Sequence, residues 1–229
     1  MVRPLPLRRP FDRERSSPFG YACAGCNRCC HGKVIPLNPY EVARIAAHLG
    51  ISTTDALARF TRDCGASLLS CDDGSCVFLA KDGCSIHSSR PLACRVYPLG
   101  RHVAKDGREA FAEVEPHPDT EGDYTQPGTV ADYLRTQGAE PYIAASDRYL
   151  ALFRVMLRAL AQREDVAEAC EEATRAVRTV PAEADAGMLD VDAVVARFCG
   201  ERGRAIPDDV EGRVALHIEA LEAMLADRP

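Results

Sequence analysis

The stretch from Cys23 to Pro98 organises this chain, and it opens with the run Cys23-Ala-Gly-Cys26-Asn-Arg-Cys29-Cys30. It continues with Cys71, Cys76 and Cys84 and closes with Arg90-Pro91-Leu92-Ala93-Cys94-Arg95-Val96-Tyr97-Pro98. Nine of the eleven cysteines of the chain lie in it. A C-x2-C spacing on a turn lets two thiolates converge on one soft metal ion, and repeating the spacing adds a third thiolate. The pattern therefore indicates a metal-binding module.

The expected cellular compartment supports metal over disulfides. The sequence shows no apolar signal region at its start and no apolar run of about eighteen residues, so we expect a cytoplasmic protein without a membrane partner. Thiols are kept reduced in the cytoplasm, where clustered cysteines bind metal or carry out redox chemistry. The alternatives are buried free thiols or a secreted disulfide knot. We disfavour both because structural thiols scatter along a chain and these do not.

Eight cysteines are candidate ligands. Cys30 is expected to point away from its neighbour Cys29, serving a second metal or the far edge of a cluster. With Cys71 the candidates fill two four-cysteine sites, and without it one site has three cysteines and an open position where chemistry takes place. Cys64 is interpreted as a core residue rather than a ligand. The candidate metal ligands are Cys23, Cys26, Cys29, Cys30, Cys71, Cys76, Cys84 and Cys94.

At these residues the chain resembles the YkgJ-type cysteine-cluster family of zinc- or iron-chelating domains. The family pattern is C-x2-C-x2-C-C, then C-x-F-L, C-x-I and R-P-x2-C-R-x-[YF]-P. The matching segments here are Cys23–Cys30, Cys76-Val77-Phe78-Leu79, Cys84-Ser85-Ile86 and Arg90–Pro98. Two positions depart from the pattern, since Cys71 is an additional cysteine and His87 stands where tyrosine is common. The second departure argues against His87 as an obligatory ligand.

The resemblance carries expectations about cofactors. The family includes flagellin lysine N-methylases, which implies an iron–sulfur cluster, and S-adenosylmethionine enters only through this resemblance. Arg90, Arg95 and Tyr97 are the candidate cofactor-binding residues. The two arginine cations flank Cys94, where they would offset the charge of a polythiolate site or receive an anionic substrate. Salt bridges to acidic surface groups are an equally favoured role for them.

The composition and the absence of several motifs argue against some classes of protein function. The net charge of −6, the absence of Trp and an aromatic content of 6% argue against a nucleic-acid partner. No Walker A, G-x-G-x-x-G, G-x-S-x-G or H-E-x-x-H motif occurs, so a nucleotide-binding sheet is not supported. The remaining partners are a metal ion or cluster and a protein or small-molecule substrate.

We expect an α+β fold, mostly α, with a small metal-organised cysteine-rich core, a short β-hairpin and a helical C-terminal region. The expected domains are an extended arm over residues 1–20, a cysteine-cluster domain over 21–130 and a helical region over 131–229. Asn38, Pro39, Glu41 and Gly50 carry the start and stop signals of one helix. A second helix is expected from Ser52 to Gly65. Further expected helices cover 130–137, a longer segment starting at Ser146-Asp147, 166–177, 192–200 and 207–225.

Smaller features complete these expectations. Val77-Phe78-Leu79 predicts a strand, and residues 102–104 and 110–112 predict a hairpin around Lys105-Asp106-Gly107-Arg108. Cys170 and Cys199 lie on apolar helix faces and are interpreted as core thiols. The acidic loop carrying Glu115, His117 and Asp119 is interpreted as a plain loop rather than an iron site.

Two functions remain from the sequence. The favoured one is a metal-binding protein that carries an iron–sulfur cluster, with group transfer such as methyl transfer as its chemistry. The alternative is a zinc-binding structural or interaction module without catalysis. The sequence leaves open whether the protein is an enzyme.

Overall fold

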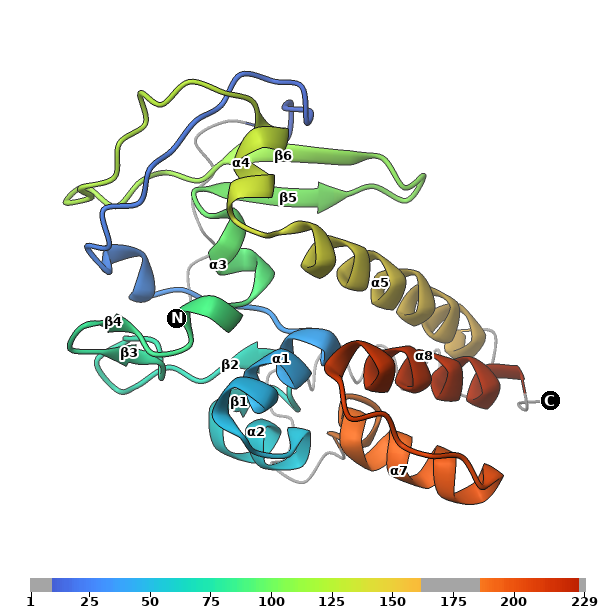
Figure 1. Cartoon of the computed structure of the whole chain (residues 1–229). Coiled ribbons are helices and arrows are strands. Elements are labelled where there is room, and N and C mark those ends of the chain that lie inside the picture. The colour runs from blue at the N-terminus through green and yellow to red at the C-terminus, as the bar shows by residue number, and fades with distance from the viewer. Residues whose placement is uncertain (1–9, 162–185, 227–229) are drawn as a thin grey trace. The chain divides into compact units, whose positions relative to one another are not determined.

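The computed structural model describes residues 10–161 and 186–226 and divides the chain into two compact units. One unit comprises Met1–Pro36 and Leu68–Ile143, and the other comprises Leu37–Ser67 and Ala144–Pro229. Short antiparallel strand pairs and a larger number of helices make up the described elements (Figure 1). The expected α+β fold with a helical C-terminal region is therefore confirmed. None of the described helices combines the length and the apolar character needed to cross a bilayer.

The cysteine-rich part of the first unit consists of short elements joined by turns. Within the described residues, regular structure over 71–98 comes in pieces of two to five residues, so backbone ladders hold little of it together. The strand expected at Val77–Leu79 is displaced to Leu79–Ala80, where it pairs with Gly83–Cys84. The elements are η1 (Arg28–Cys30), β3 (Leu79–Ala80), β4 (Gly83–Cys84), η2 (His87–Ser89) and α3 (Leu92–Val96).

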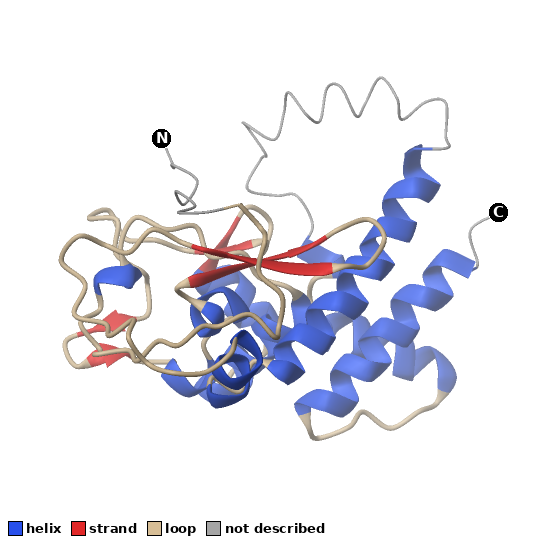
Figure 2. Ribbon diagram, turned by 90° about the horizontal axis from the view of Figure 1, so that it is seen from above, coloured by secondary structure: helices blue, strands red, loops and turns tan. Residues whose placement is uncertain are grey.

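A hairpin and a helix form the hydrophobic part of the same unit. Strand β5 (Leu99–Val103) pairs with β6 (Glu109–Glu113), with Arg101 opposite Phe111, as the sequence predicts for the residues around Lys105–Arg108 (Figure 2). Phe111 is fully buried and packs in a cluster with Val130 and Leu134 of α4 (Val130–Thr136). The backbone of Arg13 pairs with Phe111 of β6, and that of Pro18 pairs with Thr129.

The second unit is helical. Helix α1 (Pro39–Leu49) has the expected capping box of Asn38 and Glu41 and ends at Gly50, whose φ of 66° is the left-handed conformation that glycine adopts readily. The other elements are α2 (Thr53–Phe60), β1 (Thr61–Arg62), β2 (Ser67–Leu68), most of α5 (Glu140–Ala161), η3 (Ala186–Met188), α7 (Val191–Arg202) and α8 (Val210–Ala226).

Helix α2 ends earlier than the sequence predicts. The Thr61 hydroxyl donates to the carbonyl of Leu57 at 2.6 Å, and Thr61 itself is extended. Asp63 and Cys64 then adopt left-handed φ values of 55° and 56°, which a helix does not contain. Cys64 consequently lies in a turn and not on the helix face where we expected it.

Three further helix ends differ from expectation because packing outweighs local signals. Helix α5 begins at Glu140, six residues before Ser146, since Pro141 suits a first turn and the following Tyr142 and Ile143 are buried. Helix α7 passes Gly200 and stops at Gly203, because one interior glycine costs only about 1 kcal/mol. Helix α8 starts at Val210 instead of Pro207. The helix expected over 166–177 lies outside the described residues.

Candidate metal centre

The first cysteine run is shaped by two left-handed residues. Gly25 has φ of 68° and Asn27 has φ of 60°, and these reverse the chain between Cys23 and η1. The backbone N–H of Gly25 donates to the sulfur of Cys23 at 3.4 Å, a contact that stabilises a thiolate. The N–H of Cys30 donates to the carbonyl of Asn27 at 2.9 Å. The spacing C-x2-C-x2-C-C therefore folds as a tight turn followed by one turn of 3-10 helix.

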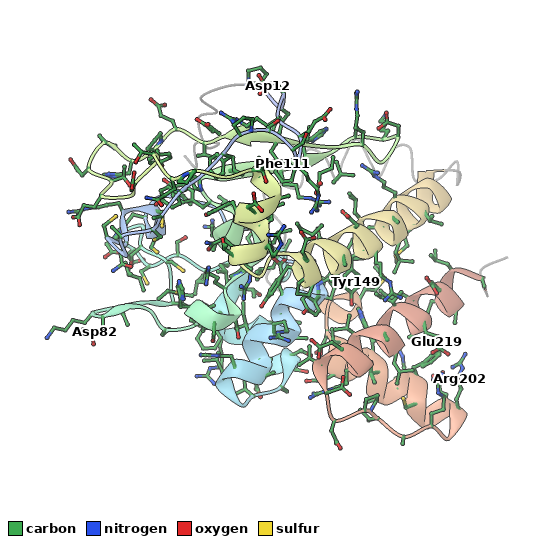
Figure 3. The ribbon with its side chains drawn as sticks, turned by 45° about the horizontal axis from the view of Figure 1, so that its top comes forward. Asp12, Asp82, Phe111, Tyr149, Arg202 and Glu219 are labelled. Atoms are coloured by element: carbon green, nitrogen blue, oxygen red, sulfur yellow. The ribbon has the colours of Figure 1, made fainter. Side chains whose placement is uncertain are left out.

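The segment 71–76 is hydrogen-bonded to this run. The N–H of Cys76 donates to the carbonyl of Cys30 at 2.8 Å, and the N–H of Gly32 donates to the carbonyl of Gly74 at 2.9 Å. Cys71 closes the turn by donating its N–H to the carbonyl of Ser75 at 2.8 Å. Two cysteine-bearing segments that are distant in sequence are thus adjacent in space, and Figure 3 shows sulfur atoms, in yellow, gathered beside the pale blue segment with η1.

Cys84 and Cys94 come from two further elements. Cys84 lies in β4 opposite Leu79, and Cys94 lies in α3, where its N–H donates to the carbonyl of Pro91 at 3.0 Å. The Cys29 thiolate is among the groups that raise the pKa of Cys84, after burial, which acts most strongly. The thiols of Cys94 and Cys76 likewise raise the pKa of Cys30. Thiols from three other chain segments therefore lie within electrostatic range of η1.

The adjacent thiols of Cys29 and Cys30 face each other. A hydrogen bond from Cys30 is the main cause that lowers the pKa of Cys29 to about 6, against the opposing effect of burial. The same bond, together with burial, raises the pKa of Cys30 strongly. The expectation that Cys30 points away from Cys29 is wrong, because the two thiols are hydrogen-bonded to each other. Cys29 is the thiolate of the pair near neutral pH.

The donor set has the chemistry of a soft-metal site. All ten cysteines that the structure describes are free thiols. Across residues 10–161 and 186–226, no three His, Cys, Asp or Glu side chains already stand in a geometry that holds an ion. Sulfur donors from linked turns, one of them a thiolate, are the ligands that zinc and iron–sulfur clusters accept. The ligand roles of the eight candidate cysteines stay predictions.

The Arg95 side chain is buried and makes its hydrogen bonds inside the protein. It is 7% exposed, and its guanidinium donates to the carbonyls of Arg90, Gln137 and Ser88 and to the hydroxyl of Tyr142. The same group lies 4.0 Å from the centre of the Tyr142 ring. These contacts fix the chain around α3 and hence the position of Cys94. A contact between Arg95 and a cofactor stays a prediction.

Arg90 and Tyr97 lie closer to the thiols. Arg90 donates to the carbonyl of His87 at 2.7 Å and to the side chain of Gln137 at 2.8 Å. Burial lowers its pKa, while the thiols of Cys94 and Cys84 raise it. Burial raises the pKa of Tyr97, followed by the Cys29 thiolate. Both residues therefore border the cysteine cluster, as the sequence motif suggests, and their cofactor contacts stay predictions.

The sequence analysis missed a lysine and three tyrosines at this site. Burial and the Cys23 and Cys29 thiolates raise the pKa of Tyr21, whose ring lies 4.8 Å from that of Tyr124 and 6.2 Å from that of Tyr133. Lys33 follows the cysteine run directly and lies over Tyr97. A lysine heading the apolar segment Val34-Ile35-Pro36-Leu37 was the one available signal in the sequence.

The other cysteines and the acidic loop are not part of this cluster. Cys199 is 1% exposed, which confirms it as a core thiol, and Cys170 lies outside the described residues. Cys64 belongs to the second unit and is half-buried. In the acidic loop, the ring nitrogen Nδ1 of His117 accepts the N–H of Asp119 at 3.1 Å. That contact is typical of a loop turn and agrees with the plain-loop interpretation.

These features give the cysteine-rich part of the chain the sulfur donors that a metal-chelating domain uses. Residues 22–116 match the family CxxCxxCC, described as "Putative zinc- or iron-chelating domain". The match indicates a function in chelating zinc or iron for this segment. No curated protein and no solved structure matches the chain.

Proposed function

We propose that residues 22–116 bind an iron–sulfur cluster through thiolates of the eight cysteines at positions 23, 26, 29, 30, 71, 76, 84 and 94. The observation that carries this proposal is the hydrogen bond between the adjacent thiols of Cys29 and Cys30, with Cys76 and Cys94 within electrostatic range. Sulfurs in hydrogen-bond contact can ligate the same centre, and the eight candidate thiolates exceed the four that one tetrahedral ion takes. An extended cluster accepts sulfurs from a wider range of directions.

The surroundings support an anionic, sulfur-only centre. The described Cys29, Cys30, Cys76, Cys84 and Cys94 side chains are each half-buried, so bound metal would be partly screened from water. The cations of Lys33 and Arg90 act on the Cys94 thiol. A cluster supplies one-electron chemistry when bound, and the chain supplies thiolates, burial and positive charge. Methyl transfer with S-adenosylmethionine rests on family resemblance alone and is not part of the proposal.

Zinc is the second candidate, and the left-handed turn at Gly25 and Asn27 favours it. In this turn the N–H of Gly25 donates a hydrogen bond to the Cys23 sulfur. A compact turn of this kind directs the two thiolates of a C-x2-C pair towards one ion. In that case the metal would hold together the short elements over 71–98. The domain would then act as a binding or interaction module.

Purification without oxygen, followed by assays of iron, zinc and acid-labile sulfide, separates the two candidates. A cluster makes the protein brown, gives iron and sulfide in similar amounts, and bleaches in air. A colourless protein that holds zinc in a whole-number ratio and no sulfide overturns the cluster and leaves the zinc module. A protein that retains neither metal after both have been supplied overturns chelation by this domain.

A further inference from the structure

The ammonium group of Lys33 is buried without a hydrogen bond. Its Nζ lies 3.5 Å from the centre of the Tyr97 ring and has no hydrogen-bond partner within the part of the chain that the structure describes. An ammonium that is removed from water and left unpaired costs several kcal/mol, so such a group persists where other interactions compensate it. The face of an aromatic ring compensates about 2 kcal/mol when the cation is desolvated. A further source of negative charge is therefore expected at Lys33.

The choice of lysine at this position is unusual for this chain. The sequence holds three lysines and twenty-five arginines. Lys81 follows β3 and Lys105 follows β5, and both are exposed at the turns of hairpins. Lys33 alone of the three is withdrawn from solvent.

The groups that compensate Lys33 are the cysteine thiols. Burial lowers the pKa of Lys33 most strongly, and the thiols of Cys29, Cys94 and Cys30 act in the opposite direction. These thiols come from η1 and α3, so two elements of the domain carry sulfur within electrostatic range of one ammonium. Arg90 is a second cation in range of Cys94. The domain thus places two fixed positive charges against its cysteines.

We propose that Lys33 is the internal counter-charge of a metal centre with a net negative charge, ligated by thiolates without neutral imidazole. This inference rests on the proposed metal binding and adds to it the charge of the centre and the residue that balances it. A divalent ion bound by four thiolates carries two surplus negative charges, whereas two thiolates and two neutral imidazoles leave none. Lys33 and Arg90 together match the first centre and not the second.

A charge-removing variant tests the role of Lys33, with zinc alone as the probe because it binds thiolates without sulfide. Lys33→Met keeps the length and apolar stem of the side chain. We expect its affinity for zinc, measured by competition with a chromophoric chelator, to fall at least about tenfold, since a nearby charge acts strongly in a partly buried site. Lys33→Arg retains the charge and should bind more tightly than Lys33→Met. The matched control is Lys81→Met, which removes an exposed lysine and should bind as the wild type does.

Amine labelling of the wild-type protein provides a measurement that does not depend on a variant folding. Because the chain has three lysines, mass spectrometry assigns each acetylated amine. We expect Lys33 to react more slowly in the zinc-loaded than in the metal-free protein, because attraction to an anionic centre keeps the ammonium in its buried position over Tyr97. Lys81 and Lys105 should react equally in both states.

The outcomes separate this inference from the proposed function. If the wild type does not bind zinc or iron, the proposed function fails. If the wild type binds metal, Lys33→Met binds it as tightly, and zinc leaves the labelling of Lys33 unchanged, the metal centre stands and the counter-charge is overturned. A tenfold loss in Lys33→Met with slower labelling of Lys33 on loading supports both.

Discussion

Arg95 and Tyr142 form a buried pair in which the guanidinium donates to the tyrosine hydroxyl at 3.0 Å and stacks 4.0 Å from the ring centre. The same guanidinium is buried, and its other N–H groups donate to the carbonyl oxygens of Arg90, Gln137 and Ser88. These contacts connect the Arg-x-Tyr-Pro end of the cysteine motif to the first turn of α5. Arg95 therefore has a structural role, because it holds the chain around Cys94 in place.

Replacing Arg95 should therefore destabilise the protein. Arg95→Met leaves the carbonyls of Gln137 and Ser88 without their donor, and we expect the free energy of unfolding to fall by about 2 to 4 kcal/mol. Urea denaturation at one fixed metal concentration measures it. Arg108→Met, in the exposed turn between β5 and β6, is the control and should change stability by less than about 0.5 kcal/mol. Equal stability of the two variants would contradict the structural role of Arg95.

Part of this fold follows from the sequence because the relevant signals are local. The capping box of Asn38 and Glu41 and the stop at Gly50 involve residues of one helix and its ends. The structure confirms both features. The start of α5 was misplaced because the burial of Tyr142 decides it, and burial depends on residues elsewhere in the chain. Likewise, α7 passes Gly200 and ends at Gly203, whose φ of 62° is left-handed, and the sequence offers a glycine at both positions.

The same distinction applies to the site. The cysteines were identified from spacing and order, which a linear motif preserves. The burial of Lys33 was not predicted. Lys33 is buried because Tyr97 lies against its ammonium group, and these two residues are far apart in sequence. The mutual orientation of Cys29 and Cys30 was misjudged because adjacency alone does not specify the 3-10 turn that brings their thiols together.

Cysteines inside and outside the motif should differ in their effect on bound metal. Cys26→Ser removes a candidate ligand and should lower the metal content per chain, whereas Cys199→Ala changes a thiol that is 1% exposed in the helical unit and should leave it unchanged. Cys170→Ala, which rests on the sequence alone, should also leave it unchanged. Elemental analysis after gel filtration measures the content, and circular dichroism checks folding. Loss of metal from a folded Cys199→Ala protein would place a ligand outside the cysteine motif.

His217 should make the protein less stable in mild acid. It is fully buried against Tyr149, whose hydroxyl lies 2.9 Å from its Nδ1, and burial lowers its pKa to about 4 (Figure 3 labels Tyr149). An unfolded chain has a histidine pKa of about 6.5, so between these values the unfolded state binds a proton that the folded state does not. Stability is therefore fully present above about pH 6.5 and is lost as the pH falls towards 4.

The expected loss is about 2 kcal/mol between about pH 7.5 and pH 5, measured by urea denaturation. His217→Gln removes this contribution, so its stability should depend less on pH than that of the wild type. His48→Gln, a change at an exposed histidine of α1, should leave the pH dependence as it is. If His217→Gln and wild-type proteins lose stability equally on acidification, the lowered pKa of His217 does not operate in solution.

The central claim is that cysteines from separate turns of residues 22–116 bind one metal centre, and differential alkylation tests it most directly. Metal-free and metal-loaded proteins are treated with iodoacetamide, and mass spectrometry counts the modified thiols at each position. We expect metal to protect cysteines from both the 23–30 run and the 71–94 segment, with no added protection at Cys64 or Cys199. Equal modification of both groups of cysteines with and without bound metal would contradict the account.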